Sequence, residues 1–211
     1  MRAFRSAARS YGPLMTIDPA TFEFYQSQAP HYSLSGALGH SRHLDGFLDR
    51  LEPGARVLEL GCGTGRDSAR IMERRFDLDA TDGVPAMVAK ANERHDIGAR
   101  LMPFDQLDAI EKYEAVWAHA CLLHCPQAEL PNVLGRIRRS LRAEGYHYAS
   151  YKLGDGESRD LLGRLNNFPD ADWLLATYKE TGFDLVDSET FAGKGSDGTM
   201  RDWMALTVRK S

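Results

Sequence analysis

Residues 57–65 read Val-Leu-Glu-Leu-Gly-Cys-Gly-Thr-Gly, and this stretch decides the fold. Its first four residues form a short apolar run rich in branched side chains, which is typical of a buried central strand. Three glycines follow at alternate positions, Gly61, Gly63 and Gly65. Such a loop turns tightly and brings backbone amides close to a ligand at the start of the next helix. The stretch therefore predicts a strand, a loop that binds a nucleotide-like ligand, and a helix.

The same alternation of elements continues along the chain. Further strands are predicted at 76–82, 99–102, 113–119, 146–152, 183–191 and 203–208. Helices are predicted at 21–28, 40–51, 67–75, 85–93, 130–141 and 173–181. Strands that alternate with helices indicate parallel pairing through right-handed crossovers. We therefore predict a doubly wound α/β fold, with a mostly parallel seven-stranded sheet and an antiparallel C-terminal hairpin.

Length and composition bound the organisation of the chain. The 211 residues, 43% of them hydrophobic, suit one core. We expect a basic, loosely ordered arm over residues 1–15 and a single domain over 16–211, in which the helices of about 20–51 form a lid. A net charge of −4 argues against a nucleic-acid partner. The arginines near the end of the 130–141 helix read as a solvated face beside the helix dipole.

The apolar runs and the cysteines of the sequence indicate the compartment and exclude some kinds of partner. No apolar run approaches the roughly 18 residues that a membrane span needs, so we expect no membrane partner. The three cysteines, Cys62, Cys121 and Cys125, offer no disulfide framework and favour a reducing compartment, with the cytoplasm as the default. Cys121, Cys125 and the neighbouring histidines lack a second spaced ligand pair, so we expect no metal site.

The spacing of the glycines selects among nucleotide-like ligands. Dinucleotide sites follow G-x-G-x-x-G/A, whereas Arg66 follows Gly65 here, and no Gly-Lys-Ser/Thr is present for a P-loop. Residues 57–65 instead resemble the first motif of class I S-adenosylmethionine-dependent methyltransferases, an acidic residue followed by G-x-G-x-G. The resemblance implies that S-adenosyl-L-methionine is the cofactor. It also implies that the backbone of Gly61–Gly65, with Cys62, contacts the methionine part and that Glu59 organises the ammonium group.

Asp82 stands twenty-one positions after Gly61, close to the roughly 20 expected for an acidic residue that binds a ribose diol. The alternative is that Asp82 only caps the helix that begins at Pro85. The resemblance further implies apolar contacts to the adenine from Val84 and Met87, and Gly83 next to them is also expected to bind the cofactor. Phe104 and Asp105 resemble the segment on the other side of the adenine, and Asp105 is either the substitute acceptor for its amino group or only a loop residue.

The region after the fourth predicted strand would face the methyl acceptor. Ala118 and His119 end that strand, where we expect both to contact the cofactor, and His124 follows in a recurrent family segment. Either histidine could act as a general base near neutral pH, although such histidines more often shape a pocket. Tyr25 and Tyr32 lie in the N-terminal segment, which in related enzymes folds over the cofactor as a lid and contacts its carboxylate end. Surface packing is the competing interpretation for both tyrosines.

The resemblance covers residues 44–211 and is nearest to small bacterial methyltransferases of the tellurite-resistance-related type. It implies methyl transfer to a small-molecule acceptor, which the net charge suggests is neutral or cationic. One rival is an NAD or nucleotide-sugar enzyme on the same fold, which the position of Gly65 disfavours. The other is a regulator or scaffold that binds the cofactor without catalysis. The sequence does not identify the oligomeric state or the acceptor, for which a thiol, a metalloid, an amine and a carboxylate all remain open.

Overall fold

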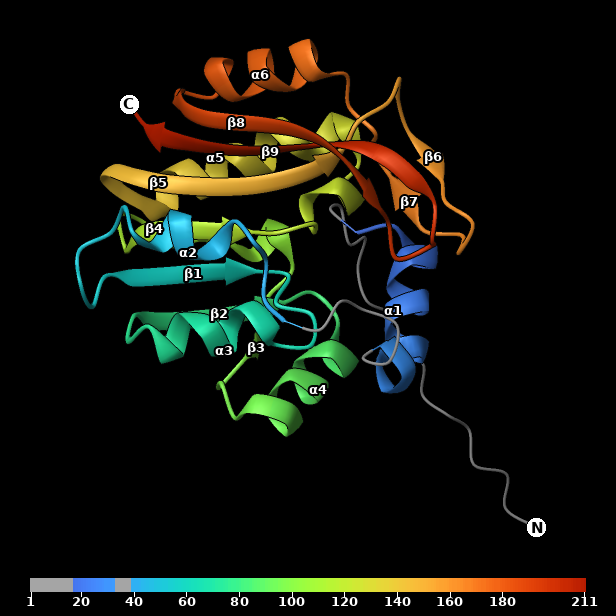
Figure 1. Cartoon of the computed structure of the whole chain (residues 1–211), viewed down its shortest axis with the longest axis horizontal. Helices are drawn as coiled ribbons and strands as arrows, with labels where there is room; N and C mark the ends of the chain where they lie inside the picture. The colour runs from blue at the N-terminus through green and yellow to red at the C-terminus, as the bar shows by residue number, and fades with distance from the viewer. Residues whose placement is uncertain (1–16, 33–38) are drawn as a thin grey trace.

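The computed structural model describes residues 17–32 and 39–211, and for 30–32 it describes the helical backbone alone. The arm expected over residues 1–15 lies outside this part. The sheet has seven strands in the order β3-β2-β1-β4-β5-β9-β8 (Figure 1). Their bounds are β1 Arg56–Leu60, β2 Asp77–Asp82, β3 Arg100–Leu101, β4 Tyr113–Ala118, β5 Leu141–Lys152, β8 Phe183–Lys194 and β9 Met200–Lys210. This is the predicted doubly wound sheet, with its order reversing between β1 and β4.

Alternate residues of the central strand β4 supply the two sides of the core, as the period of two in a strand requires. Ala115 and Trp117 pack with the helices α2 (Leu44–Leu48) and α3 (Arg66–Glu73). Val116 and Ala118 pack with α5 (Leu130–Ser140) and α6 (Ala171–Glu180). Helix α4 (Pro85–His95) buries Ala91 against the edge near β2. The layers are therefore helix, sheet and helix.

The two strands of the C-terminal hairpin are not added to the sheet in chain order. β9 runs antiparallel to both of its neighbours, β5 and β8, and separates them, so β8 forms the edge. In this register Lys152, the last residue of β5, lies opposite Trp203 of β9. The ends of β5 and of the hairpin therefore meet at one point, next to the carboxyl ends of the parallel strands.

Several short elements complete the chain and differ from the sequence-based prediction. Helix α1 (Pro19–Tyr32) is longer than predicted, and α2 is shorter. A small hairpin of β6 (Ser158–Arg159) and β7 (Leu165–Asn166) was not predicted, because two-residue strands carry no periodicity. The 3-10 turns are η1 (Phe104–Gln106), η2 (Leu122–His124) and η3 (Gln127–Glu129). Figure 1 shows α1 beside this hairpin, at the carboxyl ends of the sheet strands. Among the described helices, none has the length and apolar character needed to cross a bilayer.

Candidate functional site

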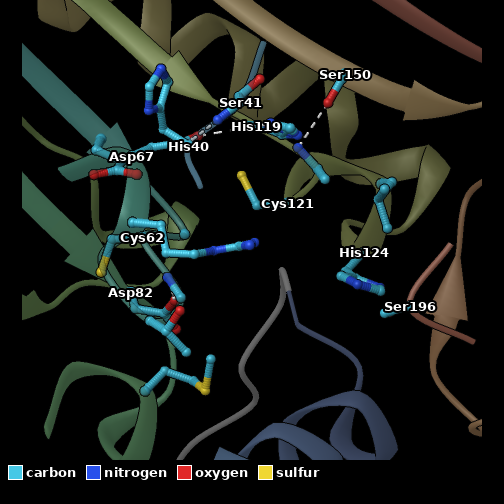
Figure 2. A pocket seen from close by; sticks show the side chains of 18 of the residues that line it. His40, Ser41, Cys62, Asp67, Asp82, His119, Cys121, His124, Ser150 and Ser196 are labelled. Atoms are coloured by element: carbon cyan, nitrogen blue, oxygen red, sulfur yellow. Dashed lines mark hydrogen bonds and ion pairs between the residues drawn. The ribbon is translucent and has the colours of Figure 1, made fainter. Parts of the chain in front are cut away.

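A cavity of about 1300 Å³ opens at the carboxyl ends of the parallel strands, where ligands bind in doubly wound sheets. Its wall runs from the glycine loop and the end of β2 to α1, the end of β5 and the β8–β9 connection. In Figure 2, Cys62 and Asp82 lie on one side, His124 and Ser196 lie on the other, and Cys121 lies between them. The cavity therefore has two ends, which we call the glycine-loop end and the β5 end.

The glycine loop is held in place by its neighbours. Gly61 has a φ of +67°, and a Cβ at this position would lie 2.4 Å from the Cβ of Cys121. The Cys121 thiol donates to the carbonyl oxygen of Leu60 at 3.0 Å. Only glycine combines this backbone conformation with such a close approach. The loop after β1 and the segment after β4 are thus packed directly against each other, and both face the cavity.

Glu59 ends up buried at the glycine-loop end, with 3% of its surface exposed. Burial, with the negative charge of Asp67, raises the pKa of its carboxyl group to about 8. The hydroxyl of Ser68, on α3, donates to Glu59. Glu59 is therefore protonated at neutral pH in the free protein. A cationic ligand group beside it would favour the ionised form.

Asp82, at the end of β2, joins the second strand to the glycine loop. Its Oδ2 accepts from the amide of Gly63 at 3.0 Å, and its Oδ1 accepts from the amide of Val84 at 2.9 Å. Burial raises the pKa of Asp82 to about 6, although these amides act in the opposite direction. A carboxylate oxygen has two lone pairs, so each oxygen keeps acceptor capacity for a ligand hydroxyl.

Most of the predicted cofactor residues meet at this cavity. The described members that line it are Tyr25, Glu59, Gly61, Cys62, Gly63, Asp82, Gly83, Val84, Met87, Phe104 and His119. Three others, Gly65, Asp105 and Ala118, do not line it, and their predicted contacts stay predictions. Gly65 immediately precedes α3 with a φ of +80°, and a Cβ at this position would lie 3.0 Å from Ile97 Cδ1. Tyr32 ends α1, and its side chain lies outside the described part of the chain.

His119 lies on the cavity wall immediately after β4. Its Nδ1 is 3.8 Å from Asp67 Oδ2, and burial lowers the pKa of its imidazole. Asp67, in the first turn of α3, accepts from the indole nitrogen of Trp117 at 2.9 Å and from the amide of Ser41 at 2.7 Å. Nδ1 of His119 has no hydrogen-bond partner among the described residues. This histidine is therefore neutral at pH 7 and faces the cavity.

His124 has both ring nitrogens engaged. Nδ1 donates to the carbonyl oxygen of Leu165 at 2.7 Å, so Nε2 carries no proton and accepts from the hydroxyl of Tyr25 at 2.9 Å. That hydroxyl in turn accepts from Arg164 Nη1 at 2.7 Å. Burial, with the positive charge of Arg164, lowers the pKa of His124 to about 3. These contacts join α1, η2 and the β6–β7 hairpin, and they leave His124 poorly suited to accept a proton.

Helix α1 is attached to the β6–β7 hairpin by further contacts. Arg159 binds Asp18 through two nitrogens, at 2.8 and 2.9 Å. The amide of Leu165 donates to the hydroxyl of Thr21 at 2.8 Å. On its other side α1 contacts α4, where Met87 and Val84 pack with Ala29. One helix thus spans both ends of the cavity.

The sequence-based prediction did not single out Asp67, Lys152 or Arg164 as site residues, although all three line the cavity. Asp67 stands in the first helical turn after the glycine loop. Lys152 is a charged residue at the end of a strand whose last residues are all buried, and a lysine in that position could have been recognised from the sequence as a candidate site residue. Arg164 lies between β6 and β7, and at the cavity it contacts Tyr25, which is 139 positions away along the chain. Local pattern could not have found it.

Comparisons with known proteins agree with this geometry. Residues 57–145 match the family model described as a methyltransferase domain. Trans-aconitate 2-methyltransferase of Deinococcus radiodurans is 29% identical over 133 residues, which cover 55% of this chain and 48% of that protein. The match thus spans about half the length of this relative. Residues 57–145 therefore resemble a methyltransferase domain.

Solved structures of methyltransferases share the fold of this chain. The 1,6-didemethyltoxoflavin-N1-methyltransferase of Burkholderia thailandensis, with bound 1,6-didemethyltoxoflavin and S-adenosylhomocysteine, has a TM-score of 0.69 and 23% identity, covering 91% of this chain and 84% of that chain. TehB from Haemophilus influenzae has a TM-score of 0.69 and 16% identity, covering 89% and 67%. The resemblance to tellurite-resistance-related proteins therefore rests on fold alone.

S-adenosylmethionine is the cofactor of this class, and the glycine-loop end fits it. The amides of the loop and the buried carboxyl group of Glu59 suit an amino-acid head that carries an ammonium group. Asp82 offers acceptor oxygens for hydroxyls, and Met87, on α4, supplies an apolar wall. Among the described residues, no cluster of three histidine, cysteine or acidic side chains could hold a metal ion.

Proposed function

We propose that this chain catalyses S-adenosylmethionine-dependent methyl transfer to a small-molecule acceptor. The observation that carries the proposal is the two-ended cavity of about 1300 Å³. Pockets for one drug-sized ligand measure about 300–1,000 Å³, so this cavity has room for the cofactor and a second small molecule. Its place at the carboxyl ends of β1 and β4 is the place of ligands in this fold.

At the glycine-loop end, each residue receives a role in holding the cofactor. The amides of Gly61–Gly65 and the carboxylate of Glu59 bind the methionine head, and Asp82 binds the ribose hydroxyls. Val84 and Met87 form one wall for the adenine, and Phe104 forms the other. When bound, S-adenosylmethionine supplies an electrophilic methyl group, whose bond to sulfur breaks with both electrons going to sulfur as the acceptor forms the new bond.

At the other end, this chain's residues position the acceptor and exclude water, which can supply most of the acceleration in such a displacement. Helix α1 acts as a lid, because it contacts α4 at one end of the cavity and the β6–β7 hairpin at the other. Tyr25 and His124 hold this lid in place. His119 is the residue available to accept a proton from an acceptor that must lose one. The free, buried state of Cys62, Cys121 and Cys125 supports a cytoplasmic location.

The proposal is tested in two steps with the purified chain. Isothermal titration with S-adenosylmethionine and S-adenosylhomocysteine, with NAD as the negative control, should give micromolar dissociation constants for the first two only. Release of S-adenosylhomocysteine during incubation with a panel of small acceptors should then show turnover. A folded protein that binds neither compound would refute the proposal. Binding without turnover on any acceptor would instead support a regulator.

A further inference from the structure

Lys152 is a buried cation in the cavity wall at the β5 end. Its residue is 2% exposed, and it lines the cavity. Its Nζ donates to Asn166 Oδ1 at 3.1 Å and lies 5.7 Å from the centre of the Trp203 ring. An ammonium group has three donors, and among the described contacts Asn166 uses one of them. Burial lowers the pKa of Lys152, and the positive charge of Arg164 lowers it further.

A second buried cation stands beside Lys152. Arg164 is 1% exposed, lines the cavity and binds Asp160 Oδ2 through Nε at 3.0 Å and Nη2 at 2.6 Å. Burial raises the pKa of Asp160, but the hydrogen bonds and charge of Arg164 outweigh this and leave it lowered. Asp160 is therefore ionised and committed to Arg164, while its Oδ2 lies 3.9 Å from Lys152 Nζ.

The charges in this group do not balance. Lys152 and Arg164 carry two positive charges, and Asp160 carries one negative charge. Asp197 and Arg201 add one charge of each sign beside Lys152. Asp197 raises the pKa of Lys152 and has the larger effect of the two, and Arg201 lowers it. Burying an uncompensated charge is costly, and proteins commonly resolve it by binding a counter-charge. Lys152, Arg164 and Arg201 together with Asp160 and Asp197 therefore carry one net positive charge.

The remaining charged residues of the wall agree with this assignment. The described carboxylate residues that line the cavity are Glu59, Asp67, Glu73 and Asp82, all from β1, α3 or β2. Lys194, on β8, adds a third lysine or arginine to the β5 end. The described wall at this end thus has cations without a lining carboxylate. It is suited to an anion, which differs from the neutral or cationic acceptor that the net charge suggested.

We propose that the β5 end is the acceptor subsite and binds a carboxylate of a small organic acid, with Lys152 as the direct donor and Arg164 as the second charge. This inference rests on the proposed function and names its acceptor class. Lys152 is a specificity-determining residue, and Asn166 and Asp160 position it. Methyl transfer to an ionised carboxylate requires no proton acceptor, because the oxygen already carries the lone pair that forms the bond to carbon. The product is then a methyl ester, and the pair from the broken bond stays on sulfur.

The test measures binding of acids and of their esters in the same protein. The chain is saturated with S-adenosylhomocysteine and titrated with acetate, succinate and trans-aconitate, each against its full methyl ester. The same titrations are made with Lys152→Gln and with Lys179→Gln, a matched change of an exposed lysine on α6. At least one acid should bind about tenfold or more tightly than its ester. Lys152→Gln should weaken that acid at least about tenfold, as expected for a lost charge-assisted hydrogen bond, and Lys179→Gln should leave it within about twofold.

The affinity for S-adenosylhomocysteine separates the two proposals. Failure of the folded wild-type chain to bind it would defeat the proposed function itself. Normal binding of it, with no acid bound or with acid and ester bound alike, would overturn the carboxylate subsite alone. Equal effects of Lys152→Gln and Lys179→Gln would remove Lys152 from the subsite. Should Lys152→Gln fail to fold, the comparison of acid with ester in the wild-type chain still decides whether the β5 end binds a carboxylate.

Discussion

Glu59 is the group whose charge state should most clearly link stability to pH. Its pKa is about 8 in the folded protein, mainly because it is buried, and 4.5 is the ordinary value for the unfolded chain. Between these two pH values the native protein holds a proton that the unfolded chain has lost. The free energy of unfolding contributed by Glu59 is therefore full below pH 4.5 and is lost as the pH rises through 8.

The magnitude follows from 1.36 kcal/mol for each pH unit. Between pH 6.5 and 8.5 the contribution of Glu59 falls by about 2 kcal/mol, which is roughly 4–8 °C in the melting temperature of a chain of this size. We choose this window because the buried histidines, with lowered pKa values, titrate below it. Glu59→Gln keeps an acceptor for Ser68 and has no charge to lose. The variant should therefore gain about 2 kcal/mol on the wild type across the window.

The assay is urea unfolding followed by circular dichroism at several pH values, with Glu180→Gln as the control for an exposed glutamate. The control should track the wild type at every pH. Glu59→Gln should at the same time weaken binding of S-adenosylhomocysteine, since it lacks the carboxylate proposed for the ammonium group. A constant difference in stability between Glu59→Gln and the wild type from pH 6.5 to 8.5 would refute the reasoning.

Three further substitutions test the site. Asp82→Asn should weaken binding of S-adenosylmethionine by about 1–3 kcal/mol in a calorimetric titration, and an unchanged affinity would remove Asp82 from the ribose site. Gly61→Ala should lower the free energy of unfolding by about 2 kcal/mol or more, with a smaller loss in a Cys121→Gly background, because the 2.4 Å contact then disappears while the strained φ remains. Equal losses in both backgrounds in urea would contradict this. Tyr25→Phe should destabilise the chain by about 1–3 kcal/mol in the same assay and leave S-adenosylhomocysteine affinity unchanged, whereas a loss of affinity would place Tyr25 at the cofactor.

The fold was predictable because its signals are local. The apolar run before Gly61 and the period of each helix are read from neighbouring residues, and alternation of strands with helices then implies the parallel sheet. The predicted run at 57–60 corresponds to β1, Arg56–Leu60. The position of β9 between β5 and β8 carries no such local signal, because it depends on which strand pairs with the end of the chain.

The site also has one part that could be predicted from a local motif and one part that could not. Glu59, the glycines and Asp82 belong to one motif of the chain, and the structure brings them to one cavity. The β5 end depends instead on contacts such as that of Tyr25 with Arg164, which are separated by 139 positions. Burial also changes the role that the residue type suggests. A histidine is a common general base, but burial lowers the pKa of His124 so far that it serves as a structural hydrogen-bonding residue instead. The spacing of residues in the sequence reveals neither which distant residues come into contact nor which side chains become buried.

The position of Trp203 gives the molecule an optical reporter of its own. The chain has three tryptophans. Trp203 lines the β5 end beneath the ammonium of Lys152, while Trp117 binds Asp67 beside the glycine loop. Indole emission responds to the charge and polarity near the ring, so the two residues should report on the two ends of the cavity separately. Replacing Trp203 or Trp117 with phenylalanine would then assign each change in emission to one end, and the order in which ligands enter could be followed by light alone.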